Sequence, residues 1–358
     1  MTDDTWPARG RAQLLHRPDL GGIPATVRWL LAVQAQDIAA VPLALRARSP
    51  GCTAADVAAA RADRAIVRTW GPRGTLHLIA ADDLHWLFPL VRTGPAGSLR
   101  RLRQLGVTTD LDEAVRVVDR VLLGHGPMSK AELGAAITKA GLPAEGQAIV
   151  HLASLGARAG LVVLGPDLGG KATYVHAADW LGTTVPTTTD RATALAELVR
   201  RYRRAHHPAE PADLAAWSGL PMGEVMAGWR AAGDEPVPVS VDDGDAVVRL
   251  LPGYDEYLLG WRDRPVAAPH LREVHPGGGV LRPAVCVGGR LAGTWRIRRT
   301  GGELRIVVTP FGRLPDRVAA ALTAEAADVG RFLNVRTTMN IDADRPTTQG
   351  EPDDRRRL

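Results

Sequence analysis

The chain lacks several features that would place it in a specialised class of protein. No apolar run in its 358 residues approaches the roughly 20 residues that a membrane-spanning helix needs. Only two cysteines are present, Cys52 and Cys286, and their wide separation argues against a zinc ribbon or a disulfide framework. The N terminus lacks the basic segment and apolar block of a secretory signal. We therefore expect a cytoplasmic protein without membrane contact, whose cysteines are packing residues.

What is present is the composition of an ordinary globular protein with a basic balance. Hydrophobic residues make up 45% of the chain and charged residues 23%, with a formal net charge of +5. This length predicts two or three structural units. A positive charge permits nucleic-acid binding without demanding it. Basic side chains gather in three patches, which either follow a polyanion or form ordinary solvated faces: residues 100–103, 200–207 and 296–299.

Residues 8–95 are expected to form a cluster of helices followed by a strand pair. Thr53 carries the signal of a helix N-cap. Alternating runs at residues 66–70 and 75–79 flank the turn-rich Gly71-Pro72-Arg73-Gly74 and predict a hairpin. Helices followed by a hairpin are the arrangement of a winged helix.

The same order of elements recurs twice. A second copy begins near Asp112, where Ser129 with Glu132 three residues later predicts a capped helix. A third copy begins near Arg191, and its strand pair is expected at residues 237–241 and 246–251. The copies share little sequence, but their common order of elements indicates an internal structural repeat.

After Pro252 the helical spacing stops and strand-like runs separated by Gly-Gly turns predict a small antiparallel barrel or sheet. A helix over residues 315–333 closes this part. Polar and proline-containing residues from Arg336 onward predict a disordered tail. The strands are expected at residues 280–282, 284–287, 290–297 and 304–308.

These patterns predict an α+β fold with three tandem winged helix-turn-helix units and a small antiparallel β-barrel. The expected boundaries are 1–100, 101–185 and 186–252 for the winged helices, 253–335 for the barrel and its closing helix, and 336–358 for the tail.

The stretch Gln34-Ala35-Gln36-Asp37 sets two amides and a carboxylate into an apolar run. Counting from Val27, apolar residues fall at Leu31 and Ile38, and Gln34 takes a position where a core residue is expected. A buried amide left unpaired costs about 1–3 kcal/mol. Gln34 therefore either has protein partners or faces a wet cleft.

Four segments are distinctive in residue type and in their order along the chain: Arg11-Ala12-Gln13-Leu14-Leu15, Gln34-Ala35-Gln36, Thr69-Trp70-Gly71-Pro72-Arg73-Gly74-Thr75-Leu76-His77 and Leu251-Pro252-Gly253-Tyr254-Asp255-Glu256-Tyr257. Together they resemble the AlkZ/YcaQ family of bacterial winged-helix DNA glycosylases, over nearly the whole chain. A single winged helix would be a weak sign, because most such domains belong to transcription regulators. Three winged helices in tandem, together with these four segments and a strand-rich end, are a strong sign.

The resemblance implies a C-shaped set of winged helices and a barrel around double-stranded DNA. In the family a Gln-x-Gln or Gln-x-Asp segment supplies the catalytic side chains, here Gln34 and Gln36. Gln36 in place of Asp makes the chain more similar to the self-resistance branch, which removes bulky N7-alkylated purines left by DNA-alkylating natural products. The implied enzyme is a monomeric, monofunctional glycosylase of base excision repair, without metal or cofactor, with interstrand crosslinks among its candidate lesions.

An amide pair fits this chemistry. An N7-alkylated guanine is positively charged and leaves without strong acid catalysis, so the enzyme must position water and tolerate positive charge on the sugar. The carbonyl oxygen of an amide can orient a water while its NH₂ holds a phosphate or sugar oxygen. Asp37 is the nearest carboxylate that could stabilise the sugar or act as base, or alternatively it caps the following helix. No lysine lies in this segment, so a Schiff-base lyase step is not expected.

Geometry constrains the pair. In a continuous helix Gln34 and Gln36 would point about 200° apart. We therefore predict that the helix ends near Val33 and that the segment is extended, which puts both amides on one side. The alternative is two unrelated helical amides, with Gln34 paired in the core.

Candidate DNA contacts lie on the first wing, on a Gly-rich turn and on the basic strand. Arg73 beside a glycine suits a phosphate, and His77 is either a DNA contact or a structural hydrogen-bonder. The turn at Gly277-Gly278-Gly279 either presents Val280-Leu281-Arg282 to a groove or is a plain barrel turn. The full set is Arg68, Arg73, His77, His275, Arg282, Arg296, Arg298 and Arg299.

The neighbouring carboxylates Asp255 and Glu256 have no histidine nearby and are poor transition-metal ligands. We expect them to orient Arg262 or Arg264. Two rival hypotheses to the glycosylase stay open, a non-catalytic winged-helix DNA-binding transcription regulator and a protein-binding scaffold. Release of free base from alkylated DNA separates the enzyme from the regulator, and steeply salt-dependent DNA binding argues against the scaffold.

Overall fold

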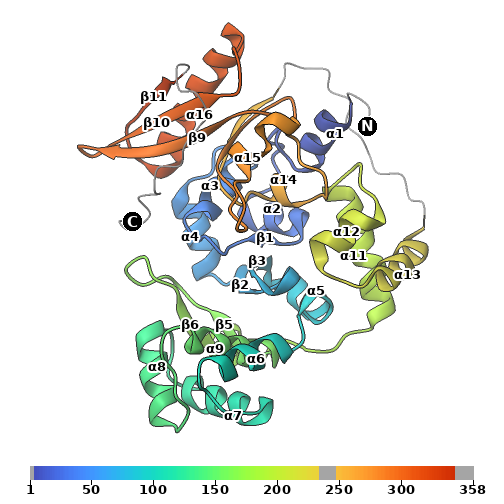
Figure 1. Cartoon of the computed structure of the whole chain (residues 1–358), viewed down its shortest axis with the longest axis vertical. Helices are drawn as coiled ribbons and strands as arrows, with labels where there is room; N and C mark the ends of the chain where they lie inside the picture. Colours follow the sequence, from blue (N-terminus) through green and yellow to red (C-terminus); the bar gives the residue numbers. More distant parts are fainter. Residues whose placement is uncertain (1–3, 234–246, 343–358) are drawn as a thin grey trace. The chain divides into compact units, whose positions relative to one another are not determined.

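A computed structural model of the chain describes residues 4–233 and 247–342. Within these limits the chain forms two compact units, each with its own hydrophobic core (Figure 1). Among the described residues, no helix combines the length and apolar character needed to cross a bilayer. The first unit combines Met1–Ala58, Arg200–Trp217 and Asp234–Leu358, and the second combines Ala59–Val199 and Ser218–Gly233.

The helices in chain order are α1 (Thr5–Ala12), α2 (Ile23–Leu30), α3 (Ala40–Arg46), α4 (Ala54–Ala62), α5 (Leu84–Val91), α6 (Ala96–Gln104), α7 (Leu111–Leu122), α8 (Lys130–Lys139), α9 (Ala148–Arg158), α10 (Ala177–Leu181), α11 (Arg191–Ala205), α12 (Pro211–Ser218), α13 (Met222–Ala232), α14 (Glu256–Leu259), α15 (Leu271–Val274) and α16 (Asp316–Leu333). Short 3₁₀ helices are η1 (Pro72–Gly74), η2 (Ala81–Asp83) and η3 (Ala268–His270).

The strands are β1 (Val33–Gln34), β2 (Ile66–Trp70), β3 (Leu76–Ala80), β4 (Met128–Ser129), β5 (Val162–Leu164), β6 (Thr173–His176), β7 (Val248–Leu251), β8 (Ala284–Val287), β9 (Arg290–Thr300), β10 (Glu303–Pro310) and β11 (Thr337–Ile341).

Both predicted helix caps are confirmed. The Thr53 hydroxyl accepts the Asp56 backbone N–H at 3.3 Å, and the Asp56 carboxylate accepts the Thr53 backbone N–H at 2.7 Å. Ser129 and Glu132 form the same reciprocal pair at the start of α8. Each pair satisfies backbone donors that a helix N terminus leaves free. Caps are local interactions, which is why the sequence predicts them.

In the second unit the predicted hairpin forms as β2 and β3, antiparallel with Thr69 opposite His77. Strand β2 also pairs with β5, β5 with β6, and β6 with β4. Helices α7, α8 and α9 followed by β5 and β6 match the predicted second copy, and the short strand β4 before α8 is an element that was not predicted. Apolar side chains of α7, α8 and α9 fill this core, with Val118 and Leu152 fully buried.

In the first unit β7 to β11 form a five-stranded sheet with the order β11-β10-β9-β8-β7. Strands β8, β9 and β10 confirm three of the predicted runs and pair antiparallel. The fourth run, 280–282, forms no strand, because its backbone bonds stay within the Gly-rich turn, with Val280 bridging Gly277 and the Arg282 N–H donating to the Val274 carbonyl. The side chain of Leu281 packs in the core. Helix α16 packs against β7 and β11 and lies along the sheet in Figure 1.

Two edge strands differ from the sequence expectation. Val248–Leu251, expected in the third wing, pairs with β8, and the expected partner run at 237–241 lies outside the described residues. Strand β11, inside the predicted disordered tail, pairs parallel with β10. Its Thr-Thr-Met-Asn-Ile sequence suits a strand that gains its hydrogen bonds only from a neighbour far away in sequence.

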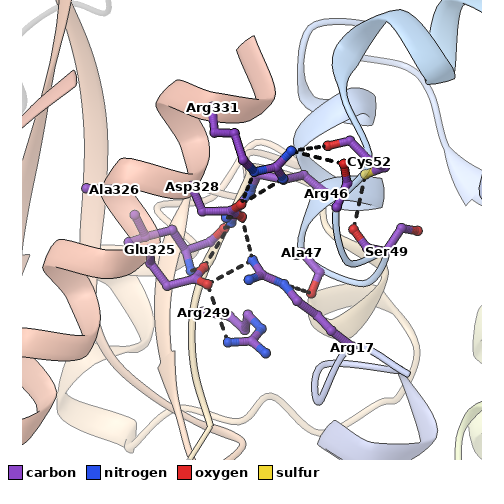
Figure 2. A network of polar contacts seen from close by, with 12 residues as sticks. Arg17, Arg46, Ala47, Ser49, Cys52, Arg249, Glu325, Ala326, Asp328 and Arg331 are labelled. Atoms are coloured by element: carbon purple, nitrogen blue, oxygen red, sulfur yellow. Dashed lines mark hydrogen bonds and ion pairs between the residues drawn. The ribbon is translucent and has the colours of Figure 1, made fainter. Parts of the chain in front are cut away.

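An ionic network joins α16 to the N-terminal helices of the first unit (Figure 2). The fully buried guanidinium of Arg46 donates to Glu325 at 3.0 Å and to Asp328 at 2.8 Å. Arg17 and Arg249 reach Glu325 at 2.8 and 3.4 Å. Because breaking a buried pair leaves a charge uncompensated, the network fixes α3, the helix that follows the Gln34 segment.

Candidate active site

Helix α2 ends abruptly in front of the amide pair. Leu31 has φ 70° and ψ −56°, and the Ala32 N–H donates to the Leu30 carbonyl at 2.9 Å. These values describe a γ-turn of the rare, strained kind. Leu31 is fully buried, so packing holds a backbone conformation that costs on the order of 1–3 kcal/mol. The turn swings the chain out of the helix and into β1.

The predicted break before the amide pair is therefore confirmed, three residues earlier than expected. Gln34 is the last residue of β1, and Gln36 follows in a bend that is not helical. Ala35 is fully buried between a half-buried Gln34 and an exposed Gln36. This alternation is typical of an extended segment in which residues i and i+2 share a face.

Gln34 has an uncommon combination of contacts. Its backbone N–H donates to Glu256 Oε1 at 2.6 Å. Its side-chain Oε1 is buried, and no hydrogen-bond partner for it occurs among the residues that the structure describes. The alternative of a helical amide paired in the core is thus excluded for this oxygen. A buried acceptor without a protein partner is a group that a water or a substrate donor would satisfy.

Asp37 lies at the surface in the turn that precedes α3. Its Oδ1 accepts the Ala39 N–H at 3.1 Å, and its carbonyl accepts the Ala40 N–H at 3.2 Å. This is the local bonding of an Asx turn. Asp37 does not cap α3, because the N-cap position of this helix is Ala39 and no side-chain hydrogen bond from the described residues caps it.

Glu256 is a contact that sequence reasoning missed. It is 2% exposed, and its second carboxylate oxygen accepts the Trp217 Nε1–H at 3.3 Å. Its neighbour Asp255 forms a bidentate pair with Arg48 at 2.7 and 2.9 Å, in place of the expected Arg262 or Arg264. Two carboxylates inside an otherwise apolar motif were the signal, but their partners lie more than 200 positions away.

The predicted contacts of the first wing belong to the second unit and are mostly covered. Arg68 is 4% exposed and its Nη1 lies 3.9 Å from Asp167 Oδ1. Arg73 is half-buried in η1 with φ 56°. His77 has no exposed surface, and its Nδ1 lies 2.9 Å from the Thr75 carbonyl. A Cβ on Gly71 would sit 3.2 Å from the His77 ring, so glycine there lets the imidazole pack against the backbone.

Burial lowers the pKa of His77 to about 3, so its imidazole is neutral. Nδ1 therefore carries the proton that it donates to the Thr75 carbonyl. This environment agrees with the expectation that His77 is a structural hydrogen-bonder and disfavours a DNA contact. A side chain without exposed surface cannot reach a ligand in this conformation.

The Gly-rich turn of the first unit is compact. His275 Nδ1 lies 2.7 Å from the Val280 carbonyl, and the Arg282 N–H donates to the Val274 carbonyl at 2.9 Å. Leu281 packs in the core, which removes it from the predicted groove-probing group. Arg282 remains exposed at the end of the turn.

The basic strand β9 divides its arginines between two faces. Arg298 lies opposite Arg305 of β10, whereas Arg299 lies opposite the buried Leu304. Arg296 shares the face of Arg298, since side chains two apart on a strand point the same way. Its Nη2 lies 3.9 Å from Asp342 Oδ2.

Two exposed guanidinium groups, Arg298 and Arg305, therefore stand side by side, and neither forms an ion pair with the described residues. Like charges directly opposite on a sheet are destabilising unless an anion lies between them. The structure thus adds Arg305 to the candidates, a residue that no sequence pattern pairs with the patch at 296–299.

Comparison with known proteins identifies the family of this chain. The family described as DNA glycosylase AlkZ-like matches residues 27–332. An interstrand DNA cross-link repair glycosylase from Streptomyces sahachiroi is 28% identical in an alignment 342 residues long, which covers 86% of this chain and 89% of that protein.

The solved structure of Streptomyces sahachiroi DNA glycosylase AlkZ has a similar mixed α and β fold. The match has a TM-score of 0.76 at 26% identity and covers 94% of this chain and 98% of that one. Because the family match spans most of the sequence, the chain belongs to the AlkZ-like DNA glycosylase family and is an enzyme that hydrolyses N-glycosidic bonds in DNA.

Proposed function

We propose that this glycosylase releases N7-alkylated purines from duplex DNA by monofunctional hydrolysis, with bulky and crosslinked adducts among its substrates. The name of the Streptomyces sahachiroi relative, an interstrand DNA cross-link repair glycosylase, supports crosslinks as a lesion class. The proposed role is repair of alkylation damage or self-resistance to a DNA-alkylating natural product. Membership in a family of glycosylases does not favour the regulator hypothesis.

The observation that carries the mechanism is the buried, unpartnered Oε1 of Gln34. The cationic base is already a good leaving group, so the enzyme gains most by holding water in line with the breaking bond. A carbonyl oxygen accepts a hydrogen bond from that water and so directs the lone pair of the water toward the sugar. Gln34 is held for this role through its backbone, and its side-chain oxygen has no competing hydrogen-bond donor among the residues that the structure describes.

Gln36 is the second proposed catalytic residue. It is exposed and separated from Gln34 by the buried Ala35, a spacing that suits two amides facing one ligand. Asp37 has one carboxylate oxygen committed to the Ala39 N–H. We therefore propose that Asp37 chiefly shapes the turn. The two glutamines position the water.

We propose that the fold serves duplex binding through three winged helices and a barrel arranged in a C shape. The element order α7-β4-α8-α9-β5-β6 supports one such winged helix in the second unit. We propose a monomer that acts without metal or cofactor in the cytoplasm, on double-stranded DNA.

For the DNA backbone we propose the outer face of β9 and β10, where Arg296, Arg298 and Arg305 gather. Exposed arginines on one sheet face suit phosphates, which take most hydrogen bonds in protein–DNA complexes. Arg282 at the end of the Gly-rich turn and Arg73 in η1 are further proposed contacts.

The test is release of free base from duplex DNA that carries N7-methylguanine or a bulkier N7-alkylguanine, measured by mass spectrometry under single-turnover conditions. Gln34→Ala and Gln36→Ala should each slow release by on the order of 100-fold, the usual effect of losing a positioned catalytic group. Gln104→Ala is the control, because Gln104 is an exposed glutamine of the second unit that accepts only a surface hydrogen bond from Arg101.

All three variants should bind undamaged duplex DNA like the wild type. Release at the wild-type rate by both Gln34→Ala and Gln36→Ala would remove these residues from the mechanism. Absence of release from every adduct, together with tight DNA binding, would favour the regulator.

A further inference from the structure

We propose that Glu256 is a positioning residue for base excision, which acts by gripping the backbone of Gln34. The inference rests on the proposed function, because it gives Gln34 a catalytic task. It concerns a buried carboxylate that belongs to neither the amide pair nor the DNA-contacting arginines.

The backbone at Glu256 is fixed by interactions that do not involve Gln34. It is the first residue of α14, and the Asp255 carboxylate caps that helix by accepting the Tyr257 N–H at 2.8 Å. Asp255 is in turn clamped by Arg48, and both side chains of this ion pair have no exposed surface. A carboxylate on such a short helix has few conformations available, because its backbone is fixed by the cap and by the ion pair.

The carboxylate of Glu256 spans two donors. Oε1 accepts the Gln34 backbone N–H at 2.6 Å, and Oε2 accepts the Trp217 indole N–H at 3.3 Å. Hydrogen bonds to an ionised acceptor are shorter and stronger than neutral ones. With a donor on each oxygen, Glu256 is suited to anchoring Gln34 rather than to removing a proton from water.

The segment is thereby fixed at three points. The strained turn at Leu31 sets its entry, the Asp37 turn sets its exit into α3, and Glu256 holds it between the two. Loss of the middle anchor would leave the ends in place and let Gln34 shift. A displacement of about 1 Å at a group that positions a reactant can cost on the order of 100-fold in rate.

The experiment compares Glu256→Ala, Glu256→Gln and Glu256→Asp with the control Glu210→Ala, which removes an exposed glutamate of the same unit. The alanine variant removes the acceptor, and the aspartate variant withdraws it by one methylene. The glutamine variant keeps one oxygen that can accept the Gln34 N–H, but its NH₂ then faces the Trp217 indole N–H, which loses its acceptor. We expect single-turnover release to fall by about 10-fold to 100-fold in the first two. The glutamine variant should stay nearer the wild type, with DNA affinity unchanged in all four.

A double-mutant cycle with Gln34→Ala isolates the coupling. Glu256→Ala should slow the wild type but should change the residual rate of Gln34→Ala by less than about twofold, since a positioning residue has nothing left to position. Additive losses, or equal losses in Glu256→Gln and Glu256→Ala, would overturn the proposal in favour of a direct role of the charge.

A readout without DNA keeps the inference separate from the proposed function. Hydrogen–deuterium exchange of a peptide that spans residues 31–40 reports whether the Gln34 amide is protected. Exchange at this amide should quicken by about 10-fold or more in Glu256→Ala and Glu256→Asp, and should be unaltered in Glu210→Ala. Unchanged exchange in these variants overturns the grip itself. Quickened exchange in the variants, together with no base release by the wild type, would overturn only the catalytic task of Gln34. If Glu256→Ala does not fold, Glu256→Asp supplies both measurements.

Discussion

Replacing Arg48 by methionine should destabilise the first unit far more than the loss of an exposed arginine. The Arg48 guanidinium donates to both Asp255 oxygens, to the Ala44 carbonyl at 2.8 Å and to Gln13 Oε1 at 3.2 Å. Methionine fills much of the same volume but donates no hydrogen bond. The Asp255 carboxylate would remain buried without a counter-charge.

Breaking a fully buried ion pair from one side costs roughly 3–5 kcal/mol. In a unit of this size 1 kcal/mol lowers the melting temperature by about 2–4 °C, so a decrease on the order of 10 °C is expected. The control is Arg317→Met on the exposed side of α16, where surface replacements stay within about 0.5 kcal/mol.

The assay is thermal unfolding followed by circular dichroism, in which each transition of the variant is compared with that of the wild type. Adding Asp255→Asn to Arg48→Met should restore part of the loss, since the amide keeps the cap on α14 and removes the buried charge. A decrease below about 2 °C for Arg48→Met would refute the reasoning that the buried Asp255 carboxylate needs the positive charge of Arg48. A further decrease in the double variant would refute it as well.

Two further predictions concern pH and salt. Burial lowers the pKa of both His77 and His206 from 6.5 to about 3. In the unfolded chain each imidazole binds a proton near pH 6.5, whereas in the folded protein it does so only near pH 3. The contribution of each neutral histidine to the free energy of unfolding is therefore fully present above pH 6.5. It falls by about 1.4 kcal/mol per histidine at pH 5.5. Urea unfolding at pH 7.5 and 5.5 measures the loss, which should halve when either histidine becomes glutamine; an unchanged loss in both variants would contradict it. Arg298→Ala with Arg305→Ala should lower the slope of log K against log salt for duplex DNA by about 2, one unit per phosphate contact. Arg317→Ala should leave that slope unchanged, and a slope equal to the wild type in the double variant would exclude this face from the DNA interface.

The sequence predicted the parts of the fold that depend on neighbouring residues. The caps at Thr53 and Ser129, the hairpin around Gly71, and the strands at 284–287 and 304–308 each follow from short-range spacing and turn chemistry. The family resemblance placed Gln34 and Gln36 in a candidate site, and the geometric requirement for a shared face predicted the break in the helix.

Other features could not be predicted because their cause lies far away along the chain. Leu31 adopts a strained turn that its own side chain disfavours, and only burial in the folded unit retains it. Leu281 looked like an exposed wedge beside glycines, yet it packs in the core. Strand β11 looked like part of a tail because a parallel edge strand gains its hydrogen bonds from a distant partner.

The sequence by itself determined the helix caps, the hairpin of the first wing, the family and the amide pair, because these depend on residue types and short spacings. Only the tertiary structure decided what holds that pair. The Gln34 N–H meets Glu256 across 222 positions, and the Asp255 beside it finds Arg48 across 207. A charged residue inside an apolar motif indicates that it has a partner in the folded protein. Burial and hydrogen-bond geometry in the folded unit determine which residue that partner is.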